Sequence, residues 1–190
     1  DSIALLCNSM ARLEVGDLGI LSFGGTTGVS ELHPLGKPFS QDSGISICSA
    51  LQFNQESTVQ ATPVMSLLKC GLNMLKSHNF DHASESDNNM MKQLFLIVAD
   101  GRINEEGDAM KSLIHDALSE GGLMIVFILL DTEKNGVLEV QTVDFVNGMP
   151  VLKNYMDSFP FPFYILLREI SSLPRTLADL IKQFISLSVS

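Results

Sequence analysis

The apolar positions of the chain fall into short uninterrupted runs and longer helical repeats. Residues 92–100 (KQLFLIVAD) and 123–131 (LMIVFILLD) are runs without alternation, which is typical of strands buried on both faces of a sheet. Between them, residues 107–120 place apolar side chains at helical spacing, and Gly121–Gly122 end the pattern. A buried strand, an amphipathic helix and a second buried strand together predict a parallel β-α-β unit.

The same alternation of strand-like and helix-like segments extends on both sides of this unit. The further elements that we expect are helices over residues 2–13, 45–53, 64–78, 151–159 and 172–187, and strands over residues 18–23, 28–35, 138–145 and 160–167. Residues 79–89 (NFDHASESDNN) are polar, acidic and aperiodic, which predicts a flexible surface loop. The order of elements favours a three-layer α/β fold, in which a mostly parallel central sheet carries helices on both faces.

Composition and charge narrow the classes of function. With 190 residues the chain is long enough for a single domain with a sizeable core. Its formal net charge of −10 disfavours direct binding to nucleic acid or to anionic membranes, and suits a basic partner or a cation. No apolar run approaches the roughly 20 residues that a membrane-spanning helix needs. Cys7, Cys48 and Cys70 show no CxxC spacing, so we expect buried thiols.

A carboxylate follows each of the two buried runs directly. Asp100 ends the first run and is followed by Gly101, and Asp131 ends the second. In parallel α/β sheets, ligands bind beyond the carboxyl ends of the strands, so both positions are candidates for a site. Asp-Gly is also a common turn pair, and an Asp at a strand end can simply turn or cap the chain. For Asp131 we favour this structural interpretation, whereas for Asp100 the pattern leaves both open.

Three chemistries could use Asp100. A nucleophilic carboxylate would need a second acid and a lysine suitably placed nearby, which DGRINEE does not supply. A dinucleotide site would need GxGxxG between a strand and a helix, and SFGGTTG (residues 22–28) has glycines with no helix after it. A hard-cation site would need oxygen ligands from several strand-end loops, and Ser57 and Thr58 lie in a polar loop just before a predicted helix.

Two alternatives to a hard-cation site remain. One is a flavodoxin-like or hydrolase-like α/β enzyme that uses Asp100 and Asp131, although the chain has no GxSxG motif, no P-loop and no ordered Cys-His pair. The other is a soft-metal pair formed by His78 and His82, four residues apart. A solvated loop is the better interpretation of these histidines because no Cys or further His lies nearby.

Several stretches of the chain resemble one known family. They are RLEVGDLGILSFG (12–24), FNQESTVQATPV (53–64), LFLIVADGR (94–102), IVFILLD (125–131) and YMDSFPFPFYILLREISSLPRTLADLIKQFISL (155–187). These stretches are similar to the C-terminal domain of the midasins, giant dynein-like AAA+ ATPases of ribosome assembly. That domain is of the von Willebrand factor A type and carries a metal-ion-dependent adhesion site. Because the resemblance covers essentially the whole chain, it implies a single domain of this type over residues 1–190.

The resemblance also implies a set of site residues. Adhesion sites of this kind hold Mg²⁺ with three loops: an Asp-x-Ser-x-Ser motif, a Thr that matches Thr58, and an Asp that matches Asp100. Ser57, Gly24, Gly25 and Gly101 flank these positions in the sequence.

One part of the family pattern is missing. No Asp-x-Ser-x-Ser occurs in the 190 residues, and in the family this motif and the central first strand lie upstream of the helix at which the chain begins. We therefore expect an N-terminally truncated domain, in which two protein ligands alone would hold Mg²⁺ weakly.

The function implied by the resemblance is that of a binding module without enzymatic activity of its own. In the family, an acidic side chain on the ubiquitin-like domain of a WD-repeat assembly factor completes the metal site. The AAA+ ring of the parent chain then pulls the tethered factor off the pre-large-subunit particle. The implied localisation is the nucleus, in the nucleolus and nucleoplasm. A structural or interaction surface without metal is a third possibility for this chain.

Overall fold

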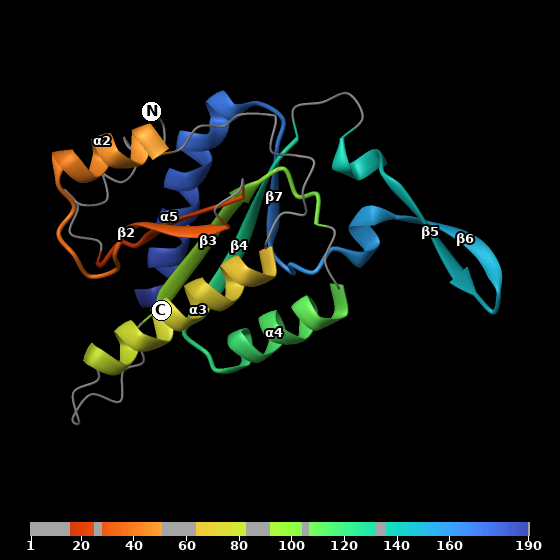
Figure 1. Cartoon of the computed structure of the whole chain (residues 1–190), viewed down its shortest axis with the longest axis horizontal. Coiled ribbons are helices and arrows are strands. Elements are labelled where there is room, and N and C mark those ends of the chain that lie inside the picture. Colours follow the sequence, from red (N-terminus) through yellow and green to blue (C-terminus); the bar gives the residue numbers. More distant parts are fainter. Residues whose placement is uncertain are drawn as a thin grey trace. The chain divides into compact units, whose positions relative to one another are not determined.

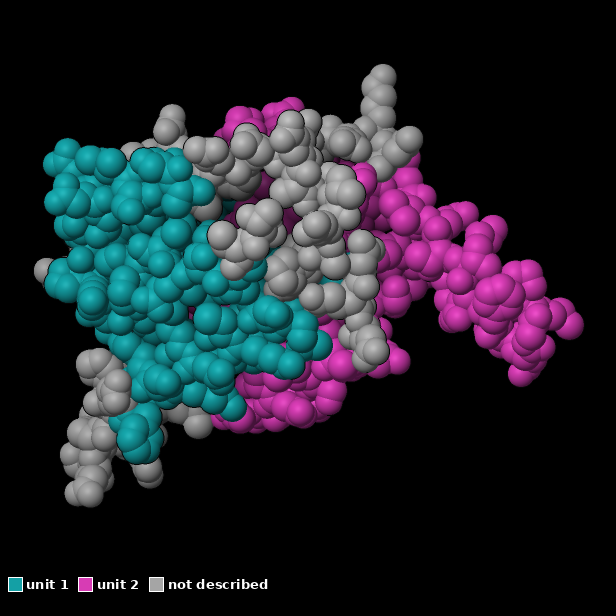
Figure 2. Space-filling model, viewed as in Figure 1, with its two compact units in different colours: residues 1–93, 103–105, 173–190 teal, residues 94–102, 106–172 magenta. Residues whose placement is uncertain are grey.

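The computed structural model describes residues 16–24, 28–50, 64–82, 92–103, 107–131 and 136–189 (Figure 1). The chain divides into two compact units, shown in different colours in Figure 2. Unit 1 comprises residues 1–93, 103–105 and 173–190, and unit 2 comprises residues 94–102 and 106–172. None of the described helices is long and apolar enough to cross a membrane.

A three-stranded parallel sheet forms the centre of unit 2. Its strands are β3 (Gln93–Ala99), β4 (Leu123–Leu130) and β7 (Tyr164–Leu167), in the order β3-β4-β7. Helix α4 (Gly107–Ser119) connects β3 to β4, and β4 pairs with β7 in parallel, from Phe127↔Tyr164 to Leu130↔Leu167. The predicted β-α-β unit is therefore confirmed, and the fold is α/β with a parallel sheet, as in von Willebrand factor A-type and Rossmann-like domains.

The two apolar strands differ in burial. In β4, Phe127, Ile128 and Leu129 are completely buried, which confirms the prediction for this strand. In β3, Ile97 is buried but the other residues keep partial exposure, so the prediction of full burial is wrong for most of this strand. The reason is position in the sheet: β4 has a strand on each side, whereas β3 is an edge strand among the described residues.

An aromatic cluster covers β4 in unit 2. The ring of Phe127 contacts the rings of Phe159 and Phe161, at centroid distances of 5.4 and 4.7 Å. Phe159 also makes edge contacts with Tyr155 and Tyr164, on its other flanks. The FPFPF segment (residues 159–163) thus packs onto β4 before the chain enters β7, as expected for aromatic pairs in a core.

An extended hairpin projects from the rest of unit 2 (Figures 1 and 2). It consists of β5 (Gln141–Val146) and β6 (Met149–Asn154), and it follows the 3₁₀ turn η2 (Val137–Glu139). Asn147 and Gly148 join the strands with φ of 53° and 79°. Two consecutive residues with positive φ make a type I′ turn, whose twist suits a two-residue hairpin loop.

This hairpin corrects the prediction of a helix over residues 151–159. Residues 151–154 belong to β6, and only a single 3₁₀ turn follows, η3 (Tyr155–Ser158). The Asn-Gly pair outweighs the weak helical pattern after it, because it fixes the register of the two strands. The predicted exposed strand over residues 138–145 is present as β5, although it begins at Gln141.

The hairpin carries an ion pair whose titration can be measured. Lys153 Nζ donates to Asp144 Oδ2 at 2.6 Å, and this hydrogen bond holds the pKa of Asp144 below its ordinary value of 3.8. A lowered carboxyl pKa means that the contribution to hairpin stability is present above pH 3.8 and is lost as the pH falls through the folded-state pKa. In Lys153→Met we expect the Asp144 pKa, measured by carboxyl NMR, to move upward. An unchanged pKa would show that Lys153 does not cause the shift.

Unit 1 contains an antiparallel strand pair and helices. These elements are β1 (Ile20–Phe23), β2 (Val29–His33), α2 (Gln41–Ala50), α3 (Val64–His82) and α5 (Leu173–Val189). The 3₁₀ turn η4 (Ile170–Ser172) precedes α5 in the sequence and belongs to unit 2. Both predicted strands and the closing helix are confirmed. The predicted helix over residues 2–13 lies outside the described residues.

Two helices of unit 1 extend beyond a predicted bound, α2 at its start and α3 at its end, whereas residues 51–53 of the first predicted helix lie outside the described residues. Helix α2 begins at Gln41 instead of residue 45, because Ser40 and Ser43 exchange side chain to backbone hydrogen bonds that cap its first turn. Helix α3 continues to His82, so the predicted flexible loop over residues 79–89 is wrong for its first four residues. The Gln93 amide donates to the Leu75 carbonyl and to Asn79 Oδ1, which holds this last part of the helix. The rest of that loop, from residue 83, lies outside the described residues.

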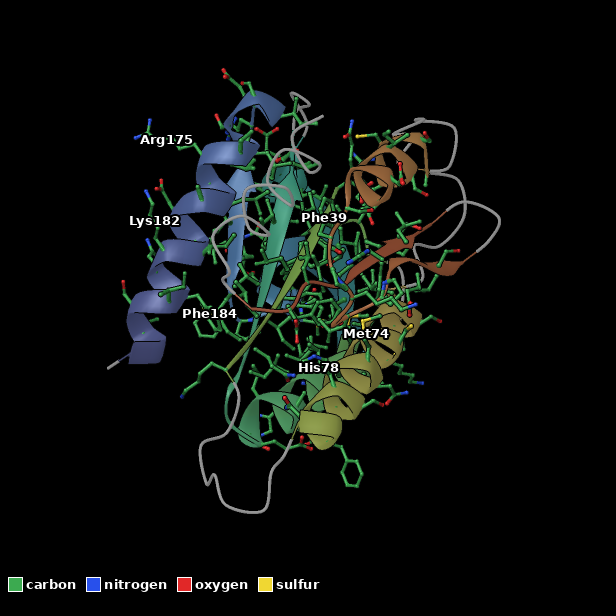
Figure 3. The ribbon with its side chains drawn as sticks, turned by 90° about the vertical axis from the view of Figure 1, so that its left-hand side faces the viewer. Phe39, Met74, His78, Arg175, Lys182 and Phe184 are labelled. Carbon is green, nitrogen blue, oxygen red and sulfur yellow. The ribbon has the colours of Figure 1, made fainter. Side chains whose placement is uncertain are left out.

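Helix α3 also places His78 and Met74 beside the first part of unit 1 (Figure 3). His78 Nε2 lies 2.8 Å from Asp17 Oδ2, and a Cβ on Gly19 would lie 3.1 Å from the Met74 sulfur. Cys48 and Cys70 are exposed, so the prediction of buried thiols is wrong for these two, and Cys7 lies outside the described residues. Both cysteines lie on exposed positions of their helices, near buried residues such as Ile47 in α2 and Leu72 in α3.

Candidate functional site

Asp100 lies at the carboxyl end of β3, as predicted, and is partly buried. Its Oδ1 atom accepts a hydrogen bond from the backbone N–H of Arg102 at 3.2 Å, which closes a short Asp turn. Its Oδ2 atom makes no hydrogen bond with any residue that the structure describes. The turn thus holds the carboxylate in a fixed direction and leaves one oxygen available to a ligand.

Gly101 is required by this turn for two reasons. Its φ is +75°, a backbone conformation that residues other than glycine rarely adopt. A Cβ at this position would also lie 1.9 Å from Cδ2 of the buried Leu129 on β4. The backbone after Asp100 therefore packs closely against the buried Leu129 side chain, and there is no room for a residue larger than glycine.

Tyr155, the first residue after β6, contacts the same turn. Its hydroxyl donates to the Gly101 carbonyl at 2.8 Å, although the two residues are 54 positions apart in the sequence. Its backbone N–H donates to the Val140 carbonyl at 2.9 Å, across the base of the hairpin. Sequence reasoning missed this residue because it expected a helix here; the Asn-Gly pair was the signal that could have placed Tyr155 at the end of a hairpin.

Asp131, at the end of β4, has a structural role, as the sequence favoured. It is buried, its Oδ2 atom accepts the Val137 N–H at 3.1 Å, and its own N–H donates to the Leu167 carbonyl. A Cβ on Gly136 would lie 2.0 Å from Oδ2, so the backbone closes tightly over the carboxylate. Since this carboxylate holds the start of η2, it gives no support to an enzyme that uses both acids.

Of the other predicted site residues, three lie outside the described part of the chain and one, Gly24, belongs to unit 1. Ser57, Thr58 and Gly25 lie outside the described residues. Gly24 is described in unit 1, with φ of +99°, and its N–H donates to the Gly28 carbonyl in the turn between β1 and β2. The soft-metal alternative is weakened because the described His78 lies in a helix and pairs with Asp17.

The sequence of the chain was compared with those of known proteins. No protein-family model matches the chain. Midasin of Dictyostelium discoideum is 30% identical over 192 residues, a match that covers 100% of the chain. Midasin of Giardia intestinalis is 33% identical over 189 residues and covers 97% of it. The chain is a relative of midasin. It spans only 3% and 4% of the length of these two midasins, so it corresponds to a small segment of each.

The midasin relationship confirms the resemblance seen in the sequence and leaves the metal ligands as a prediction. Among the described residues, no group of three or more His, Cys, Asp or Glu side chains is placed to hold a metal ion. Mg²⁺ takes several oxygen ligands in near-octahedral geometry. The free Asp100 oxygen has the right chemistry for one of them, but the part of the midasin-like chain that the structure describes does not form a complete site.

Proposed function

We propose that this midasin-like chain is a protein-binding module. It docks the ubiquitin-like domains of WD-repeat ribosome assembly factors in the nucleolus and nucleoplasm, so that the AAA+ ring of the parent protein removes these factors from pre-large-subunit particles. The module itself is not an enzyme. The observation that supports this proposal is the Asp100 carboxylate, which is oriented at the carboxyl edge of the sheet and keeps one oxygen available.

The proposal assigns Mg²⁺ to this edge. The ligands of this chain are Asp100 and Thr58, and further oxygen ligands come from a loop that bears Asp-x-Ser-x-Ser, a motif absent from the 190 residues. Bound Mg²⁺ would supply an electrostatic bridge to a carboxylate of the partner. The role of the described residues is to hold the Asp100 side chain: Arg102 orients it through its N–H, and Gly101 allows the close turn against Leu129.

The hairpin supports a protein partner over a small molecule. One face of its two strands carries Val143, Phe145, Pro150 and Leu152, which form the facing pairs Val143↔Leu152 and Phe145↔Pro150. Phe145 is 69% exposed and Leu152 is 65% exposed. Contiguous exposed apolar side chains of this kind mark protein-protein contacts. One face of a short hairpin is much smaller than the roughly 800 Å² per partner of a stable interface, so it serves as an additional contact beside the strand-end site.

The test compares Asp100→Ala with the unchanged sequence in the complete domain that includes the Asp-x-Ser-x-Ser loop. We expect Asp100→Ala to weaken binding of a ubiquitin-like domain at least about tenfold, as measured by calorimetry in the presence of Mg²⁺, because a metal ligand is lost. EDTA should weaken the unchanged domain by a similar factor and leave Asp100→Ala unaffected. Asp116→Ala, an exposed acid on α4, is the matched control. Equal affinities for Asp100→Ala and the unchanged domain, with and without EDTA, would exclude the metal bridge.

A further inference from the structure

We infer that Tyr155 is a positioning residue: its hydroxyl fixes hairpin β5–β6 relative to the Asp100–Gly101 turn. A docked partner then meets the hairpin and the strand-end turn as one preformed surface. This inference rests on the proposed function for its consequence in binding, whereas the anchoring itself concerns only residues of unit 2.

The first support is that Tyr155 bonds to both structures at once. Its N–H closes the base of the hairpin through the Val140 carbonyl, at 2.9 Å. Its hydroxyl reaches the Gly101 carbonyl, at 2.8 Å, on the residue directly after Asp100. A movement of the hairpin base therefore has to break or stretch a bond to the turn that orients the carboxylate.

The second support is that the hairpin needs an anchor at its base. Every residue of β5 and β6 is exposed, so no side chain of the strands is buried against the rest of the protein. A two-stranded hairpin without a covering layer is only marginally stable, and its direction is set where it joins the core. At that base the Asp131 carboxylate holds the segment that enters the hairpin, through the Val137 N–H. Tyr155 holds the segment that leaves the hairpin, through its bond to Gly101.

The third support is that both ends of the Tyr155 bond are stiff. The ring of Tyr155 makes an edge contact with Phe159, whose own ring packs against the buried Phe127 of β4. At the other end, Gly101 packs closely against the completely buried Leu129 side chain of the same strand, which leaves this turn little room to move. Because neither Tyr155 nor Gly101 moves freely, the hydrogen bond between them holds the hairpin in one direction relative to the turn. Loss of this bond lets the hairpin tilt.

The chain offers a matched control for this hydroxyl. Its two tyrosines, Tyr155 and Tyr164, both place their rings edge-on against Phe159, at centroid distances of 6.3 and 5.6 Å. The Tyr164 hydroxyl makes no hydrogen bond with any of the described residues. Tyr155→Phe and Tyr164→Phe thus remove the same atom from similar ring contacts, and only the first removes a bond to Gly101.

The experiment measures amide hydrogen exchange of the hairpin in both variants. In Tyr155→Phe we expect exchange over residues 141–154 to accelerate about fivefold, the factor for loss of one neutral hydrogen bond, while the β4 amides stay as protected as before. Tyr164→Phe should exchange as the unchanged protein does. Equal hairpin exchange in Tyr155→Phe and the unchanged protein, or equal acceleration in both variants, would overturn the inference.

A binding measurement separates this inference from the proposed function. In the complete domain we expect Tyr155→Phe to weaken binding of a ubiquitin-like domain about fivefold, because the two contacts are no longer preorganised. Faster hairpin exchange in a protein whose unchanged form does not bind the ubiquitin-like domain would uphold the anchoring and refute the proposed function. Faster exchange with an unchanged affinity would overturn the claim that the partner uses hairpin and turn together.

Discussion

Gly101→Ala is expected to reduce the free energy of unfolding by about 3 kcal/mol. About 1–2 kcal/mol of this comes from forcing a side chain into a backbone conformation with φ of +75°. The remainder comes from the new methyl group, which would lie 1.9 Å from Cδ2 of Leu129, a side chain that is completely buried. Urea unfolding followed by circular dichroism measures the loss.

Gly148→Ala separates the two contributions. Gly148 has nearly the same φ, +79°, but a Cβ there would meet no atom within 4 Å. We expect this variant to lose only about 1 kcal/mol, since it carries the backbone strain without the clash. A loss in Gly101→Ala no larger than in Gly148→Ala would show that the turn after Asp100 does not press on β4. Adding Leu129→Ala to Gly101→Ala should then show no coupling between the two substitutions.

The local patterns of the sequence were sufficient for the elements of unit 2 that follow one another closely. The apolar runs predicted β3 and β4, and helical spacing predicted α4 between them, because these patterns depend on neighbours in the sequence. The partial exposure of β3 could not be predicted, since it depends on which strands lie beside it. The hairpin was missed for a different reason: the Asn147-Gly148 pair is typical of a hairpin turn, but the prediction used only the helical pattern over residues 151–159.

The residues of the candidate site likewise divide into those that local sequence patterns predicted and those that depend on contacts between distant segments. Asp100 was identified from its place after a buried strand, and Asp131 was correctly expected to be structural. Tyr155 could not be found from spacing, because its bond to Gly101 joins two segments 54 residues apart and depends on the hairpin that brings them together. The assignment of Thr58 rests on resemblance to midasins alone, and this residue lies outside the described part of the chain.

Gly136→Ala is expected to destabilise the protein by about 2 kcal/mol at the other end of the hairpin base. Gly136 has an ordinary backbone conformation, with φ of −68° and ψ of 170°, which alanine adopts without strain. The added Cβ would lie 2.0 Å from Asp131 Oδ2, so the carboxylate has to leave its position. The buried Val137 N–H then loses its acceptor, and a broken hydrogen bond to a charged group in a buried site accounts for the expected loss.

A double-mutant cycle identifies the cause, because the clash requires both side chains. Asp131→Ala alone should also lose about 2 kcal/mol, since it too leaves the Val137 N–H without an acceptor. With the carboxylate removed, Gly136→Ala has nothing to collide with, so the double variant should be no less stable than Asp131→Ala. Gly107→Ala, where the nearest atom to the new Cβ is 4.0 Å away, is the control for a glycine with space around it. Additive losses in the double variant would mean that Gly136 acts through some contact other than Asp131, and that the carboxylate does not hold the base of the hairpin in the way its geometry indicates.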